Sequence, residues 1–390
     1  MGLFLDIIHL SEPQTERALS EIYKSVHDHD DRDAPHESPF VRRIIELFHA
    51  RGIARLEAVQ AELLKWSTGK YHQPGAELPA RPPGAMHMWS QAEQDLVRIY
   101  LRALPPGLWT LDDHMLMVDF VFQRYLPADA LVQEAEWMAT RSTLMGKVQA
   151  NLAKEPTFGQ ADKILAALPN SAAAAAEQFA LSKVQRSVLA IASAKGAEYV
   201  TNFADGARRQ LRGVVLKHAE AGMLKVKGTP GQALQTELLD TFATLNRDWR
   251  RIAVTEAGNN ALVGYIASLP EGSKVKRVEQ YANACPHCRR IDGQVMVVVA
   301  PDRVKKDPDT MIWVGKDNYG RAAAPKKRVG DQLVARSPDE LWWIPAGLMH
   351  PNCRGRWVPV LDNLPGEDPE FGQWLAELLR TAKLSGGGPE

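Results

Sequence analysis

Apolar residues recur at helical spacing through most of the chain before residue 270. Residues 40–66 place several apolar side chains on one face, namely Phe40, Ile44, Leu47 and Phe48. This spacing predicts an amphipathic helix. Residues 1–25 show a similar pattern, with Ser11 at an N-cap position. Between these two segments, residues 27–39 are polar and indicate a solvated linker.

Breaks rich in proline and glycine divide the helical part of the chain. The strongest break covers residues 69–85, and several helices are predicted after it, over residues 88–155. Shorter breaks at residues 104–110 and 124–130 separate these helices from one another. The first part of the chain therefore reads as a series of helices joined by short turns.

Two longer helices are predicted further along. Residues 171–200 are rich in alanine, and their apolar stripe consists of Leu181, Val184, Val188 and Ile191. The next helix begins at Pro230, with Thr229 as its N-cap. Its stripe consists of Leu234, Leu238, Phe242, Leu245, Trp249 and Ile252. Such a seam indicates burial inside one subunit, and a contact between subunits is the alternative.

The pattern changes after residue 270. Short segments rich in β-branched and aromatic residues predict strands. They cover residues 275–281, 293–300, 309–315, 340–346 and 354–360. The expected fold class is therefore α+β, in which a long, mainly helical N-terminal region precedes a domain of helices and a small antiparallel sheet.

These changes in composition predict four consecutive regions. Residues 1–80 form an N-terminal helical region with its linker, and residues 81–170 form a helical domain. Residues 171–365 form the domain of helices and sheet, and residues 366–390 form a C-terminal helix with a flexible tail.

The composition excludes several broad classes. The chain has 47 basic and 47 acidic residues, so its net charge gives no general attraction to nucleic acid or to an anionic membrane. No uncharged apolar run reaches about 18 residues, so we expect no membrane span and no membrane partner. The N-terminus lacks the basic segment of a signal peptide, and we therefore expect synthesis in the cytoplasm.

All three cysteines of the chain lie in two short motifs. Cys285 and Cys288 form a C-x2-C pair, and His350 and Cys353 form an H-x2-C pair. Two ligands separated by two residues can bind one ion from a tight turn, and two such turns complete a tetrahedral shell. The four side chains therefore predict a structural zinc site of the Cys3His type.

Other interpretations of these cysteines remain open. They could carry no metal, or Cys285 and Cys288 could form a redox pair. The segment after Cys288 reads as a turn and a strand, whereas a thioredoxin-like pair is followed by a helix. His287 could replace His350 as a ligand, but its position beside Cys288 makes joint use of the two awkward.

Evidence for catalysis is weak. His218 and Glu220 match the H-x-E motif of zinc deaminases, but a complete Cys3His shell leaves no position for the reacting water. A helix histidine with an ordinary partner or with solvent around it is the simpler interpretation. The chain has no P-loop, nucleophile elbow or dinucleotide fingerprint. We therefore predict a protein that is not an enzyme, with no catalytic residues.

Three segments share motifs with a known family. They are RDWRRIAVTEAGNNA (247–261), CPHCRRIDGQV (285–295) and PAGLMHPNCRGRW (345–357). Besides the cysteines and His350, the matching residues are Arg251, Thr255, Glu256, Asp292, Gly293, Asn352 and Arg354. Over roughly residues 171–360 the chain resembles the phage Mu F-like, or SPP1-type, minor head proteins of tailed bacteriophages. The family often has a further cysteine after the arginine, where this chain has Gly355.

The resemblance implies a structural role in phage head assembly, with residues 171–365 as the head-morphogenesis domain. It implies a low-copy component of the virion, bound in the head near the portal vertex. The implied partners are the portal protein and other head or scaffold proteins. Within the motifs, we expect Arg354 to pair with Glu256.

Contact with packaged DNA is a further expectation. Residues 301–330 contain eight lysines and arginines against four acidic residues, and Lys326, Lys327 and Arg328 are consecutive. This stretch could bind phosphates, and a solvated loop is the alternative. Two other functions stay open for the whole chain: a zinc-dependent enzyme that processes nucleic acid, as a deaminase or nuclease does, and a zinc-knuckle DNA-binding protein.

Overall fold

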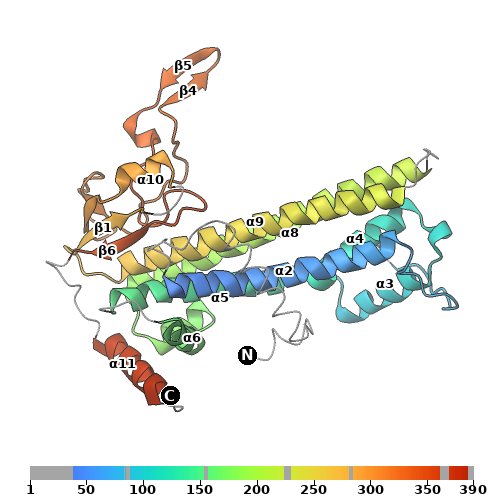
Figure 1. The fold of residues 1–390 in the computed structure, drawn as a ribbon, viewed down its shortest axis with the longest axis horizontal. Helices are drawn as coiled ribbons and strands as arrows, with labels where there is room; N and C mark the ends of the chain where they lie inside the picture. The colour runs from blue at the N-terminus through green and yellow to red at the C-terminus, as the bar shows by residue number, and fades with distance from the viewer. Residues whose placement is uncertain are drawn as a thin grey trace. The chain divides into compact units, whose positions relative to one another are not determined.

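A computed structural model describes residues 38–82, 84, 88–152, 157–223, 230–280, 284–360 and 369–384. Most of these residues are helical (Figure 1). The helices are α2 (Pro39–Ser67), α3 (Gln91–Ala103), α4 (Leu111–Tyr125), α5 (Ala128–Ala150), α6 (Phe158–Ala167), α7 (Ala172–Gln178), α8 (Lys183–Met223), α9 (Pro230–Ala267), α10 (Pro286–Ile291) and α11 (Pro369–Leu384). Short 3-10 turns lie at η1 (Pro106–Leu108) and η2 (Pro338–Glu340).

The described chain divides into two compact units built from interleaved segments. The first holds His49–Glu134 and Ala197–Ile252, and the second holds Ala135–Gly196, Ala253–Glu390 and the start of α2. The helices α2, α5, α8 and α9 each contribute a segment to both units. The four regions expected from composition follow one another along the chain, whereas these units interleave segments from distant parts of it. The four regions therefore stay a prediction.

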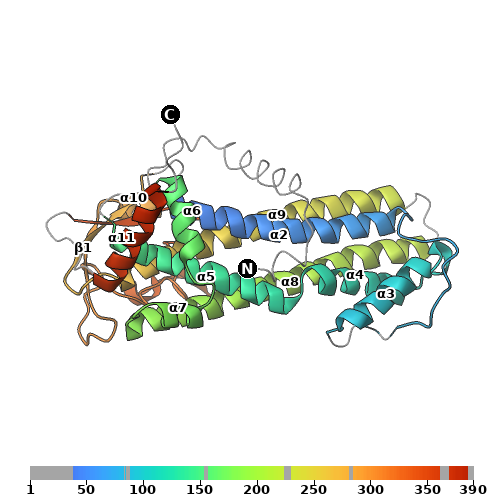
Figure 2. The same ribbon diagram turned by 90° about the horizontal axis from the view of Figure 1, so that it is seen from below.

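In the first unit, α2 lies against α9 at a glycine, as Figure 2 shows for the two helices. A Cβ atom at Gly52 would lie 1.8 Å from the Trp249 indole, so only glycine allows this approach. Arg55 on α2 and Glu134 on α5 form a buried ion pair of 2.7 Å. The predicted apolar stripe of α9 is confirmed, because its residues from Leu234 to Trp249 are buried.

The predicted helix over residues 171–200 is wrong as a single element. The chain leaves helix at Phe179, and α8 begins after Ser182. Ser182 and Gln185 exchange hydrogen bonds of 3.0 and 3.1 Å in a capping box, which starts a new helix at this point. In the predicted stripe Leu181 and Val188 are buried, but Ile191 is 55% exposed while its neighbours Leu189 and Ala192 are buried.

The second unit contains a four-stranded sheet with the order β3-β2-β1-β6. Its strands are β1 (Lys274–Val278), β2 (Val295–Val298), β3 (Met311–Ile312) and β6 (Arg356–Pro359). The central strand β1 pairs antiparallel with both β2 and β6, whereas β2 and β3 are parallel. The α+β class is thus confirmed, with a mixed sheet in place of a purely antiparallel one.

Two strand predictions need correction. Residues 340–346 form no strand, and only Leu341 makes an isolated bridge, to Ala322. Conversely, the basic stretch, for which a solvated loop was one interpretation, contains β4 (Lys326–Val329), which forms a separate hairpin with β5 (Gln332–Ala335) just after the stretch. β-branched and aromatic content alone did not distinguish buried strands from irregular segments that pack through tryptophans.

Several expectations fall on residues outside the described ranges. The predicted helix over residues 1–25, nearly all of the linker at 27–39, the Thr229 cap and the tail at 385–390 lie there. The C-terminal helix itself is present as α11. Among the described helices, none has the length and apolar character needed to cross a membrane.

Candidate metal centre

The sheet topology brings the two cysteine motifs together. The C-x2-C motif follows the end of β1, and the H-x2-C motif precedes the start of β6. Because β1 and β6 are antiparallel, with Val278 opposite Arg356, the end of one strand lies beside the start of the other. Residues more than sixty positions apart in sequence therefore meet at the same end of this strand pair.

The first motif is shaped by a helix start. Cys285 is the N-cap of α10, Pro286 occupies the first helical position, and Cys288 lies in the first turn. The backbone N–H of Cys288 points to the Sγ atom of Cys285, 3.5 Å away, as the donor of a capped helix does. This geometry turns both thiols to the same side.

The second motif is a tight turn that hydrogen bonds from other segments of the chain hold in place. The backbone N–H of Cys353 donates to the carbonyl of His350 at 3.1 Å, and Asn352 has a positive φ of 61°, which asparagine tolerates well. The hydroxyl of Thr255 on α9 accepts the backbone N–H of Asn352 at 3.1 Å. The amide of Asn318 donates to the Met349 carbonyl at 3.1 Å, just before the motif.

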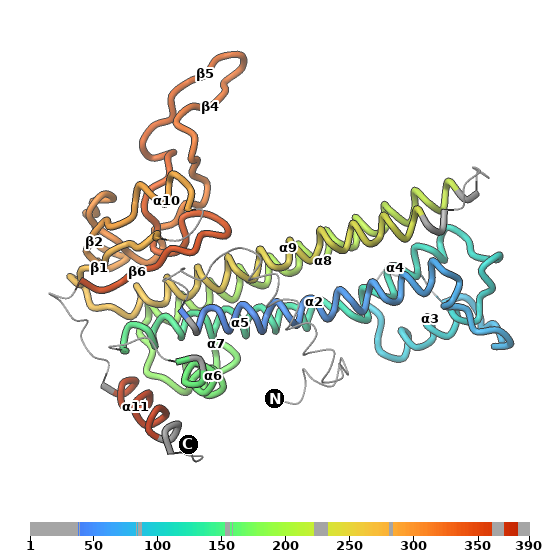
Figure 3. The backbone as a smooth tube through the Cα atoms, in the orientation of Figure 1, coloured from blue at the N-terminus to red at the C-terminus, as the bar shows by residue number. Residues whose placement is uncertain are grey.

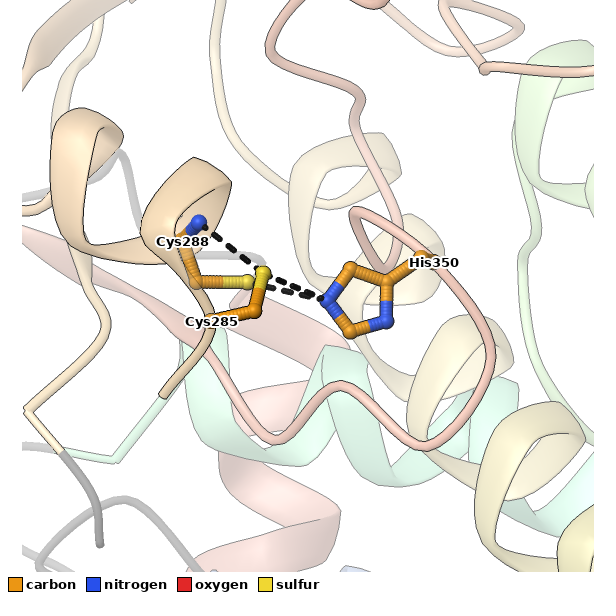
Figure 4. Close-up of side chains that lie close together, drawn as sticks. All are labelled: Cys285, Cys288 and His350. Atoms are coloured by element: carbon orange, nitrogen blue, oxygen red, sulfur yellow. Dashed lines mark hydrogen bonds between the residues drawn. The ribbon is translucent and has the colours of Figure 1, made fainter. Parts of the chain in front are cut away.

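All four predicted ligands lie close together. The Nε2 atom of His350 is 3.2 Å from the Sγ atoms of both Cys285 and Cys288, as Figure 4 shows. The Sγ atom of Cys353 is 3.7 Å from that of Cys288. Two sets of mutually adjacent donors result, Cys285 with Cys288 and His350, and Glu279 with Cys288 and Cys353, and they share Cys288. All three cysteines are described, and none is in a disulfide.

Three of the six separations between the four donors match the edges of a zinc site. Zn–S and Zn–N bonds of about 2.3 and 2.05 Å imply tetrahedral edges of about 3.8 Å between sulfurs and about 3.6 Å between sulfur and nitrogen. The measured 3.7 Å and 3.2 Å separations are within a few tenths of an ångström of these values. The cluster could therefore bind a metal through Cys285, Cys288 and His350, and Cys353, which is grouped with Cys288 and Glu279, would have to move toward Cys285 and His350 to complete the shell.

His350 presents the correct nitrogen to the thiols. Its Nδ1 atom lies 2.8 Å from the carbonyl oxygen of Pro351, which can only accept, so Nδ1 carries the proton. Nε2 then keeps its lone pair toward the sulfurs. Burial opposes protonation, but the Pro351 carbonyl and the neighbouring thiolates raise the pKa of His350. The Trp342 ring stacks on the imidazole at 6.0 Å and limits its rotation.

The surroundings of Cys353 and Cys285 favour the ionised thiolate form of these side chains. Hydrogen bonding from Cys288, with help from the Arg277 charge, lowers the pKa of Cys353 to about 3 even though burial acts against this. Burial also opposes ionisation of Cys285, but hydrogen bonds from Cys288 and His350 lower its pKa overall. Thiolates are the metal-binding form, so the environment favours ligation.

A buried ion pair that sequence reasoning missed lies beside Cys353. Arg277 donates from Nε to Glu279 at 2.6 Å, and both side chains are fully buried. A guanidinium nitrogen of Arg277 is 3.9 Å from Cys353 Sγ, and a Glu279 oxygen is 3.6 Å from it. Burial raises the pKa of Glu279, and Cys353 adds to this while Arg277 counteracts it.

The motif residues that resemble the phage family have distinct places. Thr255 fastens the second motif to α9, as described above. The carboxylate of Asp292 accepts the backbone N–H of Glu279 at 2.8 Å, and Gly293 adopts a φ of +78° in the turn before β2. These two residues therefore form the turn that leads from α10 into β2. Arg251 is exposed on α9.

The expected pairing of Arg354 with Glu256 is not found. Glu256 is only 8% exposed, and burial raises its pKa to about 7, while Lys195 acts in the opposite direction. Among the ion pairs of the described residues, none joins Glu256 to Arg354. Arg354 is partly buried in the second motif.

Glycines permit the close packing around the second motif. A Cβ atom at Gly355 would lie 1.9 Å from the Glu279 carboxylate, and one at Gly347 would lie 1.9 Å from the Asn259 amide. The Asn259 amide oxygen accepts the backbone N–H of Leu348 at 3.2 Å. Gly355, where the family often has a cysteine, is therefore required here by the buried carboxylate.

The competing histidines are accounted for. His287 is half-buried, contacts the Trp342 ring edge-on at 5.2 Å and belongs to neither donor set, so it does not take the place of His350. His218 forms a 2.8 Å hydrogen bond with Glu237 in the first unit, whereas the cysteines belong to the second. The turn and strand expected after Cys288 are present at Gly293 and β2, but three further residues of α10 come before them.

Comparison of the chain with known protein families, with curated proteins and with solved structures found no match. The role of the site is therefore inferred from its own geometry and from the motifs that meet there.

Proposed function

We propose that Cys285, Cys288, His350 and Cys353 bind one structural zinc ion. Three sulfurs and one imidazole nitrogen form a donor set that zinc favours. A bound ion would fasten the turn after β1 to the turn before β6 and add its binding free energy to the stability of this unit. The observation that carries this proposal is the 3.2 Å approach of His350 to both thiols of the other motif.

The surroundings favour a structural site over a catalytic one. A zinc enzyme needs an open ligand position and an acid that solvent and substrate can reach. The acid beside this cluster is Glu279, and it is fully buried and paired with Arg277. Cys288 and Cys353 are also buried, at 0% and 2% exposure.

We further propose that the chain is a minor head protein of a tailed bacteriophage. The support is the meeting of three motif segments that lie far apart in sequence. Thr255 of the helix motif binds Asn352 of the last motif, and Cys288 of the middle motif contacts Cys353. In this proposal the zinc-fastened unit is a rigid building block of the head near the portal vertex, and the portal and scaffold proteins are its partners.

Co-purification with phage particles tests the role in the head. The tagged chain is expressed in bacteria that produce the encoding phage, and heads are separated on a density gradient. We expect the chain in the head fraction at a few copies per particle, and cross-linking to join it to the portal protein. A chain that stays at the top of the gradient would refute the role.

A pair of variants links particle incorporation to the metal cluster. Cys288→Ser removes the sulfur shared by both donor sets, and His287→Ala removes the adjacent half-buried histidine, which belongs to neither set. We expect Cys288→Ser to lose incorporation and His287→Ala to retain it. If the first variant enters heads normally, the zinc-fastened unit is not the part that the head requires.

A further inference from the structure

The hairpin of β4 and β5 extends away from the four-stranded sheet of its unit (Figure 1, Figure 3). Seven of its eight strand residues are exposed, and Lys327 is partly exposed. The exposed residues include large apolar side chains, with Val329 at 56%, Leu333 at 69% and Val334 at 41%. An isolated two-stranded hairpin is at best marginally stable in water, so this one is suited to binding a partner.

The base of the hairpin is firmly anchored. The backbone N–H of Ala322 donates to the carbonyl of Glu340 at 2.8 Å, and the backbone N–H of Trp342 donates to the carbonyl of Ala322 at 3.1 Å. Arg336 donates to the Lys326 carbonyl at 3.1 Å, and Lys327 pairs with Glu340. The anchored base and the exposed strands describe an arm held in a fixed direction within its unit.

Positive charge is concentrated on one face of this arm, because Lys327 on the other face is paired with Glu340. The register pairs Lys326 with Ala335, Lys327 with Val334 and Arg328 with Leu333. Since paired side chains share a face and neighbours alternate, Lys326 and Arg328 lie on one face and Lys327 lies on the other. Between β4 and β5 the turn contributes Asp331, the one acidic residue from position 326 to 336.

We propose that this hairpin, residues 326–336, binds duplex DNA as a β-ribbon arm. A two-stranded ribbon fits the major groove of B-DNA. Lys326 and Arg328, exposed on one face, can contact the phosphates along a wall of the groove. Leu333, which shares the face of Arg328, would then contact base edges such as thymine methyl groups.

This site is independent of the zinc proposal. The chain as a whole has no net charge, so attraction to DNA must come from a local basic element. Two or three phosphate contacts from one arm give weak, salt-sensitive binding with little sequence preference. An arm of this kind fits contact with packaged DNA better than recognition of a particular sequence.

Fluorescence anisotropy with a labelled duplex of about 30 base pairs tests the arm in the full-length chain, over about 50–200 mM salt. Lys326→Gln with Arg328→Gln removes the two cations of one face. We expect this variant to bind more weakly and its log–log salt slope to fall by about 2, one for each lost phosphate contact.

The matched control is Lys274→Gln with Lys276→Gln, which removes two exposed lysines from β1 of the same unit. We expect it to keep the affinity and the salt slope of the unaltered chain. Absence of duplex binding at the lowest salt, or an equal loss in both variants, would overturn the proposal. Binding to polyglutamate but not to the duplex would overturn it too, and would indicate an acidic protein partner. Circular dichroism melts that agree for all three proteins exclude misfolding as the cause.

Discussion

Arg277 and Glu279 form an ion pair of 2.6 Å in which both side chains have no exposed surface. The pair lies against Cys353, so one buried cation faces a carboxylate and a thiolate together. Arg277 also donates to the carbonyl of Gly347 at 3.0 Å, which ties it to the segment before the second motif. The pair therefore connects β1 to Cys353 and to the segment that precedes the second motif.

Loss of either partner should destabilise this unit strongly. Arg277→Met leaves Glu279 and Cys353 without their cation, and Glu279→Gln removes the carboxylate opposite a buried guanidinium. Each change should cost about 3–5 kcal/mol of unfolding free energy, because the remaining charge stays buried. Urea unfolding followed by circular dichroism measures this.

The control for this prediction lies one position away on β1. Lys276 is exposed, and Lys276→Met should alter stability little. The double variant of Arg277 and Glu279 should cost less than the sum of the single ones. Single variants as stable as the control would show that the ion pair does not support the fold.

Close helix packing gives a second prediction. A Cβ atom at Gly264 of α9 would lie 2.1 Å from the carbonyl oxygen of Thr143 on α5, so the helix backbones would have to move apart. Gly264→Ala should destabilise by about 1–3 kcal/mol through overpacking. Gly213→Ala on α8 meets nothing within 4 Å and should stabilise slightly, since alanine favours helix. Thermal melts that rank the two variants the other way would contradict the packing at Gly264.

The ionisation of Glu256 should make the stability of the folded chain depend on pH. Burial raises its pKa from 4.5 to about 7 in the folded chain, with Lys195 opposing. The folded state therefore binds more protons than the unfolded state between these values, and stability falls as pH rises from about 4.5 to 7. Integrated over this window the effect is about 3 kcal/mol. Urea midpoints measured from pH 4.5 to 8 follow it.

Glu256→Gln removes this ionisation while keeping the shape of the side chain. The variant should lose the fall in stability and be more stable than the original chain at pH 8. Glu198→Gln, at an exposed position of α8, should leave the pH dependence in place. A fall in stability that persists unchanged in Glu256→Gln would place its origin elsewhere.

The cluster was predictable because metal chemistry restricts residue type and spacing. Cys285, Cys288, His350 and Cys353 stand in two pairs with a separation that few other roles require. The stripe of α9 was predictable for a similar reason, since burial imposes a period of 3.6 residues. In both cases a local pattern carries the tertiary information.

Other features depend on contacts that no local pattern encodes. Arg277 stands on the inward face of β1 with Val275, where alternation alone predicts an apolar residue, and its partner Glu279 lies just after the strand ends. The break before α8 depends on the capping box of Ser182 and Gln185, which helix-favouring alanines nearby obscure. The pairing expected for Arg354 followed from motif positions, whereas Lys195 from another helix is the cation that acts on Glu256.

Metal content combined with X-ray absorption at the zinc edge tests the central claim most directly. On chain purified without added metal, we predict one zinc per chain, with a sulfur shell near about 2.3 Å and one nitrogen neighbour. His287→Ala should retain this signal, and both Cys288→Ser and His350→Ala should lose it. A chain without zinc, or zinc retained equally in all three variants, would contradict the assignment.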